Sequence, residues 1–253
     1  MPARIIAVTS LAWEARIALG PEISVICSPG SHLGAALATA VGRGVSGIVS
    51  FGIAGGLAPD LRAGDWIVAS AVRAGEQVFP TDRAWTRSLL ERLPAAVHAD
   101  IVGMDATVAE PAGKRSLHAQ TGAAAVDTES QIAVRIASAY RIPFVACRVI
   151  IDPADTRLPP AALVGVRPDG TADAGAVFRS VLQQPSQLSD LVRIALYART
   201  ARAALSAGRR KLGAGLGFPQ FEHASSDIGT AGRIGELCRG TNRPAAATTA
   251  AVA

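Results

Sequence analysis

Short apolar runs alternate with helix-like segments along most of the chain, and this alternation constrains the fold more than any other feature. Strand-length runs separated by helical patterns are typical of a sheet packed between helices, so the sequence predicts a layered α/β domain. The predicted strands are residues 4–9, 22–27, 45–51, 66–71, 97–103, 123–126 and 143–150. The predicted helices are residues 31–43, 82–93, 128–140, 176–183 and 186–212, with a loop between 155 and about 175.

The C-terminal part of the chain differs in composition from the rest. The length of 253 residues allows one large domain or two small ones, and 49% of the residues are hydrophobic. From Gly213 onward Gly, Ser, Thr and Ala dominate, and such a segment buries too little apolar surface to offset its ordering entropy. We therefore expect one folded domain over residues 1–212 and a C-terminal extension over 213–253 that is largely disordered, with disorder from about Asn242.

Charge and cysteine content exclude several classes of protein. Lys and Arg exceed Asp and Glu by 25 − 20 = 5, a mild excess that suits anionic lipid or an anionic co-substrate rather than nucleic acid. Cys27, Cys147 and Cys238 have no metal or disulfide spacing, and the four histidines form no metal motif. No signal peptide or membrane span is recognisable. We expect a soluble cytoplasmic protein without a metal or a nucleic-acid partner.

Two stretches carry polar groups that are predicted to meet at one edge of the sheet. In residues 50–65, SFGIAGGLAPDLRAGD, an apolar run enters a glycine-rich segment that we interpret as a turn over 52–56. In residues 126–155, carboxylates begin a helix and a second pair, Asp152 and Asp155, follows a strand. Ligands of open α/β sheets bind at the carboxyl ends of strands. Backbone N–H groups beside carboxylates suit a ribose-containing ligand, and the glycine spacing excludes Rossmann and Walker loops.

These elements resemble a known superfamily. The IAGGLAP motif followed by GD, the VDTES motif and the DPAD motif, in this order and spacing, are similar to the nucleoside phosphorylase/nucleosidase superfamily. Residues 1–155 resemble its methylthioadenosine/S-adenosylhomocysteine nucleosidase type. Residues 158–178 and the following QQPSQLSDLVRIAL resemble instead the hopanoid-associated phosphorylase family. The resemblance implies a three-layer α/β/α domain with a mixed, partly curved central sheet, no cofactor except phosphate as a candidate co-substrate, and a homo-oligomer.

Cleavage of an N-ribosyl bond needs an acid for the leaving base, and Asp152 is the candidate. It follows an apolar strand, where partial desolvation raises the pKa of a carboxyl and makes it a usable acid near neutral pH. By its pattern alone, Asp152 before Pro153 also fits an ordinary turn. The resemblance implies that Asp152 holds N7 of a purine.

Glu129 is the candidate for orienting the ribose, because one carboxylate can accept hydrogen bonds from two vicinal hydroxyls. Its position at a predicted helix start fits a helix-capping role equally well. The resemblance implies binding of the 2'- and 3'-hydroxyls, although Thr128 stands where the family usually has Met. The predicted substrate-binding residues are Ile53, Ala54, Gly55, Asp127, Thr128 and Glu129.

Glu14 is the candidate for activating the nucleophile, as the resemblance implies for the attacking water of nucleosidases; by pattern it is equally a surface residue. Hexameric phosphorylases carry Arg in that neighbourhood and at the position of Ser50, and this chain has neither. Ile53 stands where a hydroxyl often touches the nucleophile. Because phosphate is best bound by Arg or Lys, the absence of these two arginines favours hydrolysis over phosphorolysis. Phosphorolysis stays open, with substitutes at Ser28, Ser31, His32 and Arg43.

The expected activity is release of adenine from a purine nucleoside, with lipid-linked adenosylhopane of hopanoid biosynthesis as the preferred substrate. Residues 158–178 are Pro-, Ala- and Val-rich and are expected to form an apolar mouth at the ribose 5' position. The arginine-bearing helix over 188–211 has either a solvated basic face or a face that contacts anionic membrane, which would make the protein peripheral to the inner membrane face. The alternatives are a general methylthioadenosine/S-adenosylhomocysteine-type nucleosidase or purine nucleoside phosphorylase acting on a small-molecule nucleoside, and a non-catalytic nucleoside-binding protein.

Overall fold

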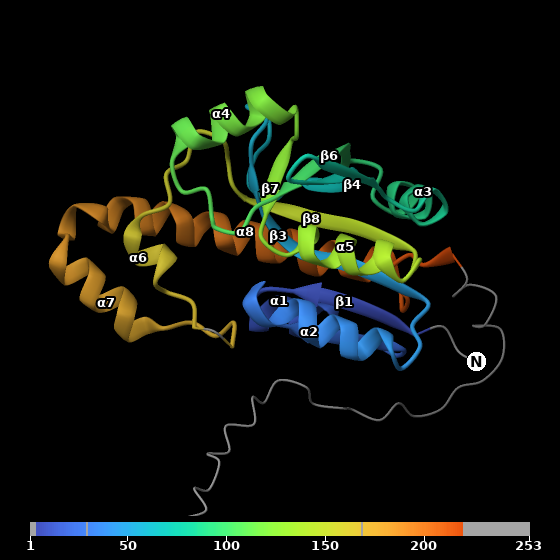
Figure 1. Cartoon of the computed structure of the whole chain (residues 1–253). Helices are drawn as coiled ribbons and strands as arrows, with labels where there is room; N and C mark the ends of the chain where they lie inside the picture. The colour runs from blue at the N-terminus through green and yellow to red at the C-terminus, as the bar shows by residue number, and fades with distance from the viewer. Residues whose placement is uncertain (1–3, 29, 168, 220–253) are drawn as a thin grey trace, which may run out of the picture.

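The computed structural model describes residues 4–28, 30–167 and 169–219. A central sheet lies between helices on both of its faces (Figure 1). Its strands are β1 (Ile5–Thr9), β2 (Ile23–Cys27), β3 (Gly47–Gly56), β4 (Trp66–Ala74), β5 (Gln77–Pro80), β6 (Val97–Gly103), β7 (Ala125–Asp127) and β8 (Phe144–Asp152). The helices are α1 (Ala12–Ala18), α2 (Gly30–Val41), α3 (Arg83–Arg92), α4 (Pro111–Thr121), α5 (Ser130–Ala139), α6 (Pro160–Leu163), α7 (Ala174–Gln183) and α8 (Leu188–Leu212), with a 3-10 turn η1 (Pro185–Gln187) before α8.

The sheet is mixed and part of it closes on itself. Its order is β2-β1-β3-β7-β6-β4-β5, and β8 pairs with both β3 and β4. Strand β8 runs parallel to β3 and antiparallel to β4, so β3, β7, β6, β4 and β8 form a closed ring of paired strands. This arrangement confirms the predicted three-layer α/β fold with a partly curved mixed sheet.

Strand β8 separates two hydrophobic cores because its side chains alternate between the faces of the sheet. Phe144 and Ala146 pack in the core that α2 and α5 cover. Val145 and Cys147 pack in the core that α1, α3 and α8 cover. Arg148 occupies the next position on the α2 and α5 face, so a charged residue is fully buried in an otherwise apolar strand.

The predicted glycine turn over 52–56 is wrong, because β3 continues as a strand through Gly56. A register shift between Ala54 and Gly55 places Gly55 opposite Asp152 of β8. Gly52 has φ 152°, and a Cβ there would overlap the carboxylate of Glu14. The glycines therefore permit close approach of other groups to an extended strand rather than a turn.

The structure contains elements that were not predicted, among them β5, α4 and α6. Helix α4 is polar and lacks a strong apolar stripe, although Pro111 begins it and Gly122 ends it with φ 68°. Both are recognised helix boundary signals. Helix α6 lies within the predicted loop after Asp155.

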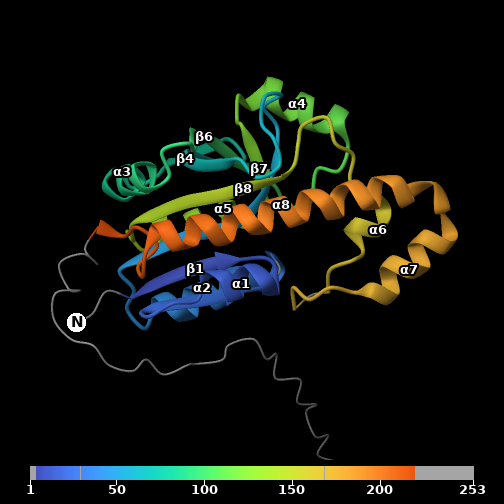
Figure 2. The ribbon, with the colours of Figure 1, turned by 180° about the vertical axis from the view of Figure 1, so that it is seen from behind.

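The two ends of α8 have different surroundings. Its N-terminal half extends beyond the sheet together with α6 and α7 (Figure 2), whereas Ala201, Leu205 and Leu212 are buried. Residues 213–219, assigned above to the extension, pack on the domain: Leu216 is buried, and its carbonyl accepts from Trp85 Nε1 at 2.9 Å. The predicted disorder after Asn242 lies outside the described residues. Within the described ranges, no helix combines the length and apolarity needed to cross a membrane.

Candidate functional site

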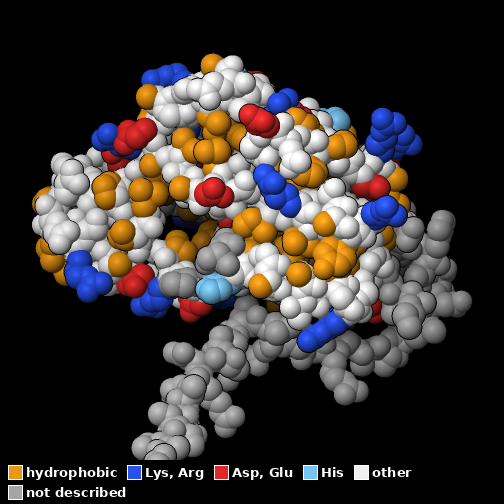
Figure 3. Space-filling model, in the orientation of Figure 1, with side chains coloured by type: hydrophobic (Ala, Val, Ile, Leu, Met, Phe, Trp, Pro, Cys, Tyr) orange, Lys and Arg blue, Asp and Glu red, His pale blue; other side chains and the backbone are white. Residues whose placement is uncertain are grey.

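A cavity of about 1010 Å³ opens where β3, β7 and β8 end, between the start of α5 and the segment around α6. In Figure 3 its opening is visible as a hollow beside α6, bordered by hydrophobic side chains. A volume of this size is at the upper end of the range for small-molecule sites. Ser10, Asp127 and Asp152 lie at or just after the carboxyl ends of strands, as expected for an α/β sheet, whereas His32 comes from α2 and Arg167 from the segment after α6.

Most of the predicted site residues line this cavity. They are Ile53, Ala54, Gly55, Asp127, Thr128, Glu129 and Asp152. Glu14 does not line the cavity and is fully buried immediately beside it, which rules out a surface role for this residue. Ser10, in the turn after β1, lines the cavity and contacts Glu14.

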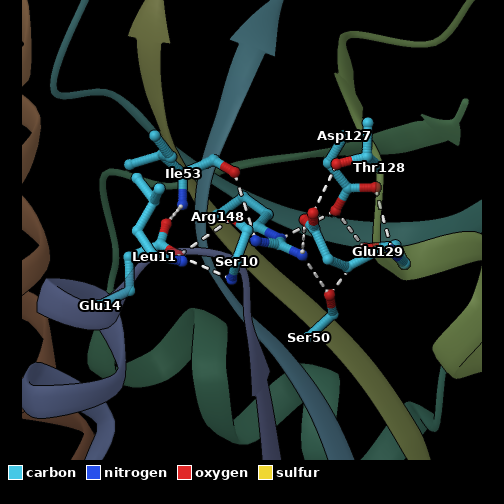
Figure 4. A network of polar contacts seen from close by, with 10 residues as sticks. Ser10, Leu11, Glu14, Ser50, Ile53, Asp127, Thr128, Glu129 and Arg148 are labelled. Carbon is cyan, nitrogen blue, oxygen red and sulfur yellow. Dashed lines mark hydrogen bonds and ion pairs between the residues drawn. The ribbon is translucent and has the colours of Figure 1, made fainter. Parts of the chain in front are cut away.

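The carboxylate of Glu14 is held by backbone N–H groups from two segments. Oε2 accepts from the N–H groups of Ser10 at 2.9 Å and Leu11 at 2.8 Å, and Oε1 accepts from that of Ile53 at 2.7 Å (Figure 4). The Ser10 hydroxyl also donates to Oε2 at 3.2 Å. Burial raises the pKa of Glu14, while Arg148 and these N–H groups lower it. Ser10 is therefore the side chain that connects this buried carboxylate to the cavity.

Arg148 is the central residue that the sequence analysis missed. Its Nη2 lies 3.1 Å from Glu129 Oε2 and donates to Ser50 Oγ at 2.5 Å. Its Nε forms an ion pair with Asp127 Oδ2 at 2.8 Å, although the geometry is not that of a directed hydrogen bond. Burial opposes its charge, but the carboxylates of Asp127, Glu129 and Glu14 raise the pKa of Arg148 above its ordinary value. A charged residue within a predicted buried strand was the available signal.

Glu129 does not cap helix α5. Its side chain forms no capping bond, and the N–H of Ser130 donates instead to Asp127 Oδ1 at 3.1 Å. Glu129 faces the cavity, where Oε1 accepts from Thr128 Oγ1 at 2.5 Å and Oε2 pairs with Arg148. Burial raises the pKa of Glu129 to about 7, Arg148 opposes this rise, and Asp127 adds to it. The carboxylate is thus free of the helix and available to a ligand.

Asp152 is paired with a lysine that the sequence analysis also missed. Lys114 of α4 is fully buried, and its Nζ forms an ion pair with Asp152 Oδ2. Burial raises the pKa of Asp152 to about 6, and Lys114 opposes that rise. Asp155 is exposed, accepts from Thr156 Oγ1 at 3.3 Å and is not among the residues that line the cavity. The DPAD motif therefore contributes a single carboxyl to the cavity.

The opposite wall of the cavity is apolar apart from Arg167, which pairs with Asp173. It is formed by Leu158, Ala162, Leu163 and Val166 from the segment around α6, and by Ile194 from α8. Leu163 and Val166 are also about half exposed at 46% each, so this wall continues onto the surface.

Among the proposed substitutes for the phosphate-binding arginines, His32 lines the cavity and Arg43 is exposed after the end of α2. No group of three or more His, Cys, Asp or Glu side chains that could hold a metal ion occurs within the described ranges.

Solved structures share this fold. Futalosine hydrolase of Helicobacter pylori superposes with a TM-score of 0.57 at 16% identity, covering 83% of this chain and 98% of that one. A 5'-methylthioadenosine/S-adenosylhomocysteine nucleosidase from Helicobacter pylori gives 0.57 at 17% identity, covering 84% and 100%. The corresponding nucleosidase from Colwellia psychrerythraea, in complex with adenine, gives 0.60 at 15% identity, covering 84% and 96%.

Sequence comparison gives one family. No curated protein sequence matches the chain. Residues 17–183 match the model of the phosphorylase superfamily. The matched residues include β3, β7, β8 and α5, which form much of the polar side of the cavity. Since this match covers more than half of the chain and the fold agrees with it, the protein belongs to the phosphorylase superfamily.

Proposed function

We propose that this protein hydrolyses the N-ribosyl bond of a purine nucleoside that carries a large apolar group at its 5' position, and that it releases adenine. Adenosylhopane, the lipid-linked nucleoside of hopanoid biosynthesis, is the proposed substrate. The observation that carries this proposal is the composition of one cavity, which combines the buried carboxyl of Asp152, the polar groups around Glu129 and an apolar wall that reaches the surface.

Each end of the nucleoside has a matching group. Asp152, with a pKa of about 6, can donate a proton to the leaving purine. Glu129 can accept hydrogen bonds from two ribose hydroxyls, since Arg148 already holds it in place. The adenine complex of the Colwellia psychrerythraea nucleosidase and the methylthioadenosine complex of a Helicobacter pylori nucleosidase variant support a purine nucleoside as the ligand.

Water suits this site better than phosphate. Arg148 is already surrounded by Glu14, Asp127 and Glu129, so the four groups would carry 1 − 3 = −2 charges if all were ionised. A phosphate dianion would be repelled by this cluster. Ser10 provides a route for the proton of an attacking water, because this residue lines the cavity and its hydroxyl donates to Glu14 Oε2.

A surface next to the cavity supports a lipid-borne substrate. Here the apolar tip denotes the exposed large hydrophobic residues of α6, α7, α8 and the segment between α6 and α7: Leu163, Val164, Val166, Phe178, Leu182, Leu188, Val192 and Leu196. Leu188, Val192 and Leu196 are spaced four residues apart and lie on one side of α8, and Arg199 and Arg202 follow as exposed cations. Apolar side chains next to arginines favour contact with an anionic membrane surface.

The test compares kcat/KM for adenosylhopane in anionic liposomes with kcat/KM for methylthioadenosine, with free adenine as the readout. The lipid-linked substrate should be preferred by at least about 100-fold, because each buried methylene contributes about 0.8 kcal/mol. Val166→Asp should reduce this preference and leave methylthioadenosine cleavage within about twofold, whereas Val78→Asp, at an exposed site on β5, is the matched control.

Three other outcomes identify the alternatives. Equal or better cleavage of methylthioadenosine would leave a general nucleosidase. Adenine release that requires phosphate and yields a sugar 1-phosphate would assign a phosphorylase. Adenine binding without release from any nucleoside would indicate a binding protein. Sedimentation without lipid tests the proposed homo-oligomer, and an oligomer that buries the apolar tip would argue against membrane contact.

A further inference from the structure

Lys114 is bound entirely to acceptor atoms at the carboxyl end of β8. Its Nζ pairs with Asp152 Oδ2 and donates to the carbonyl oxygens of Pro153 at 2.9 Å and Thr156 at 3.0 Å. An ammonium group has three N–H donors, so these contacts use all of them. The carbonyl of Asp152 is more distant at 3.3 Å. All of these neighbours are oxygen atoms that can accept hydrogen bonds, which suits an ammonium group.

The lysine also leaves only one side of Asp152 open. Oδ2 is occupied by Nζ, and the carboxyl lies over Gly55, where a Cβ would come within 3.4 Å of Oδ2 and 3.5 Å of Oδ1. Asp152 is 3% exposed and still lines the cavity. Oδ1 is therefore the oxygen that can meet a ligand.

We propose that Lys114 is a positioning residue that directs Oδ1 of Asp152 toward the leaving base and stabilises the carboxylate that remains after proton transfer. This inference rests on the proposed nucleosidase function.

The proton balance gives the lysine its role. As the C1'–N9 bond breaks, its electron pair stays on the purine, and the Oδ1 proton of Asp152 moves to N7. The ribosyl carbon takes the oxygen of water, whose proton passes through the Ser10 hydroxyl to Glu14. Asp152 is then a buried anion, which is costly unless a cation pairs with it. Solvent later removes the proton from Glu14 and restores the one on Asp152.

The charged surroundings of Asp152 are simple. Lys114 of α4 is the charged side chain that faces Asp152. Strand β3 contributes only the backbone of Gly55 and Gly56, and Asp155 in the following turn is exposed to solvent. Because Lys114 lowers the pKa of Asp152, removing the lysine should raise that pKa above its value of about 6. A general acid works while protonated, so the loss of activity at high pH should move to higher pH.

The experiment uses Lys114→Met, which keeps the length of the side chain and removes its charge. Arg115→Met is the matched control, because Arg115 lies next to Lys114 on α4 and is exposed. At pH 5, Asp152 with its pKa of about 6 is protonated in both proteins, and there the expected result for Lys114→Met is a fall of at least about 10-fold in kcat/KM for the nucleoside, because Oδ1 is no longer directed at the base. The descending limb of the pH profile should move upward by about one pH unit. On 4-nitrophenyl riboside, whose leaving group needs no proton, the loss should stay below about threefold, as for Asp152→Asn.

A second variant and a binding measurement keep the inference testable. Lys114→Gln retains two N–H donors for the carbonyl oxygens. If the Met variant does not fold, the Gln variant must show the same upward shift of the descending limb of the pH profile. Adenine affinity, measured by calorimetry from pH 5 to 9, should fall above the pKa of Asp152, and this fall should move to higher pH in either variant.

The outcomes separate the two proposals. Equal losses on both substrates, with an unmoved pH limb and unmoved adenine binding, would make Lys114 only a support for the loop and overturn the inference. A shifted adenine titration without adenine release by the unmodified protein would keep the role of Lys114 in tuning Asp152 and overturn the nucleosidase function.

Discussion

The guanidinium of Arg148 in β8 contacts the carboxylate of Glu129 at the start of α5, with Nη2 3.1 Å from Oε2. Both side chains are buried, and the same guanidinium also pairs with Asp127. The contact joins the sheet to the helix whose first residues line the cavity. It also keeps the side chain of Glu129 directed at the cavity rather than at the helix N-terminus.

Replacing Arg148 by Met should destabilise the protein by about 3–5 kcal/mol, because buried carboxylates would lose their cation. Urea unfolding at pH 7 measures this change. Arg157→Met, which removes an exposed ion pair with Glu110, is the control and should change the free energy of unfolding far less, because solvent screens an exposed pair. Similar costs for the two variants would contradict the central role of Arg148.

Glu129→Gln and Asp152→Asn should each lower kcat by at least about 100-fold, the typical contribution of a proton donor or an oriented carboxylate. Circular dichroism and thermal unfolding should show a folded protein in both cases. Asp155→Asn is the matched control, since its carboxyl is exposed, and it should retain near-native turnover. Near-native turnover in either site variant would refute the site assignment.

Stability should fall as pH rises from about 4.5 to 7. Burial raises the pKa of Glu129 from 4.5 to about 7 and that of Asp152 from 3.8 to about 6, so the folded state binds more protons than the unfolded state in this window. Under linkage, excess protons on the folded state make the free energy of unfolding decrease with pH. Thermal unfolding at several pH values checks the sign. The Glu129→Gln variant should show a shallower slope; an unchanged slope would mean that Glu129 does not titrate in this range.

Gly52→Ala should destabilise the protein by more than about 2 kcal/mol, through strain at φ 152° and overlap of the new Cβ with Glu14. Gly122→Ala is an informative control, because it also has a positive φ of 68° but its new Cβ would have no atom within 4 Å. The difference between the two variants, measured by chemical denaturation, isolates the close approach of Glu14. Equal costs would show that backbone conformation alone requires the glycine.

The sequence pattern by itself determined the fold class, because apolar periodicity and helix boundary signals are local and can be recognised in one sequence. It also placed Glu129 and Asp152 at strand ends that converge in α/β sheets, and the family resemblance then singled them out from a helix cap and a turn residue. The glycine segment was misinterpreted for the opposite reason: glycine is common in turns, and only the contact with Glu14 explains an extended strand at Gly52.

Tertiary structure alone decided which groups pair inside the site. Lys114 and Asp152 lie 38 residues apart, and Arg148 and Ser50 lie 98 apart, so no local pattern connects them. The same holds for Glu14, whose buried carboxylate accepts a hydrogen bond from the N–H group of Ile53, 39 residues away. Desolvation and ion pairing set the protonation of these carboxyls, and both depend on which distant segments pack around them.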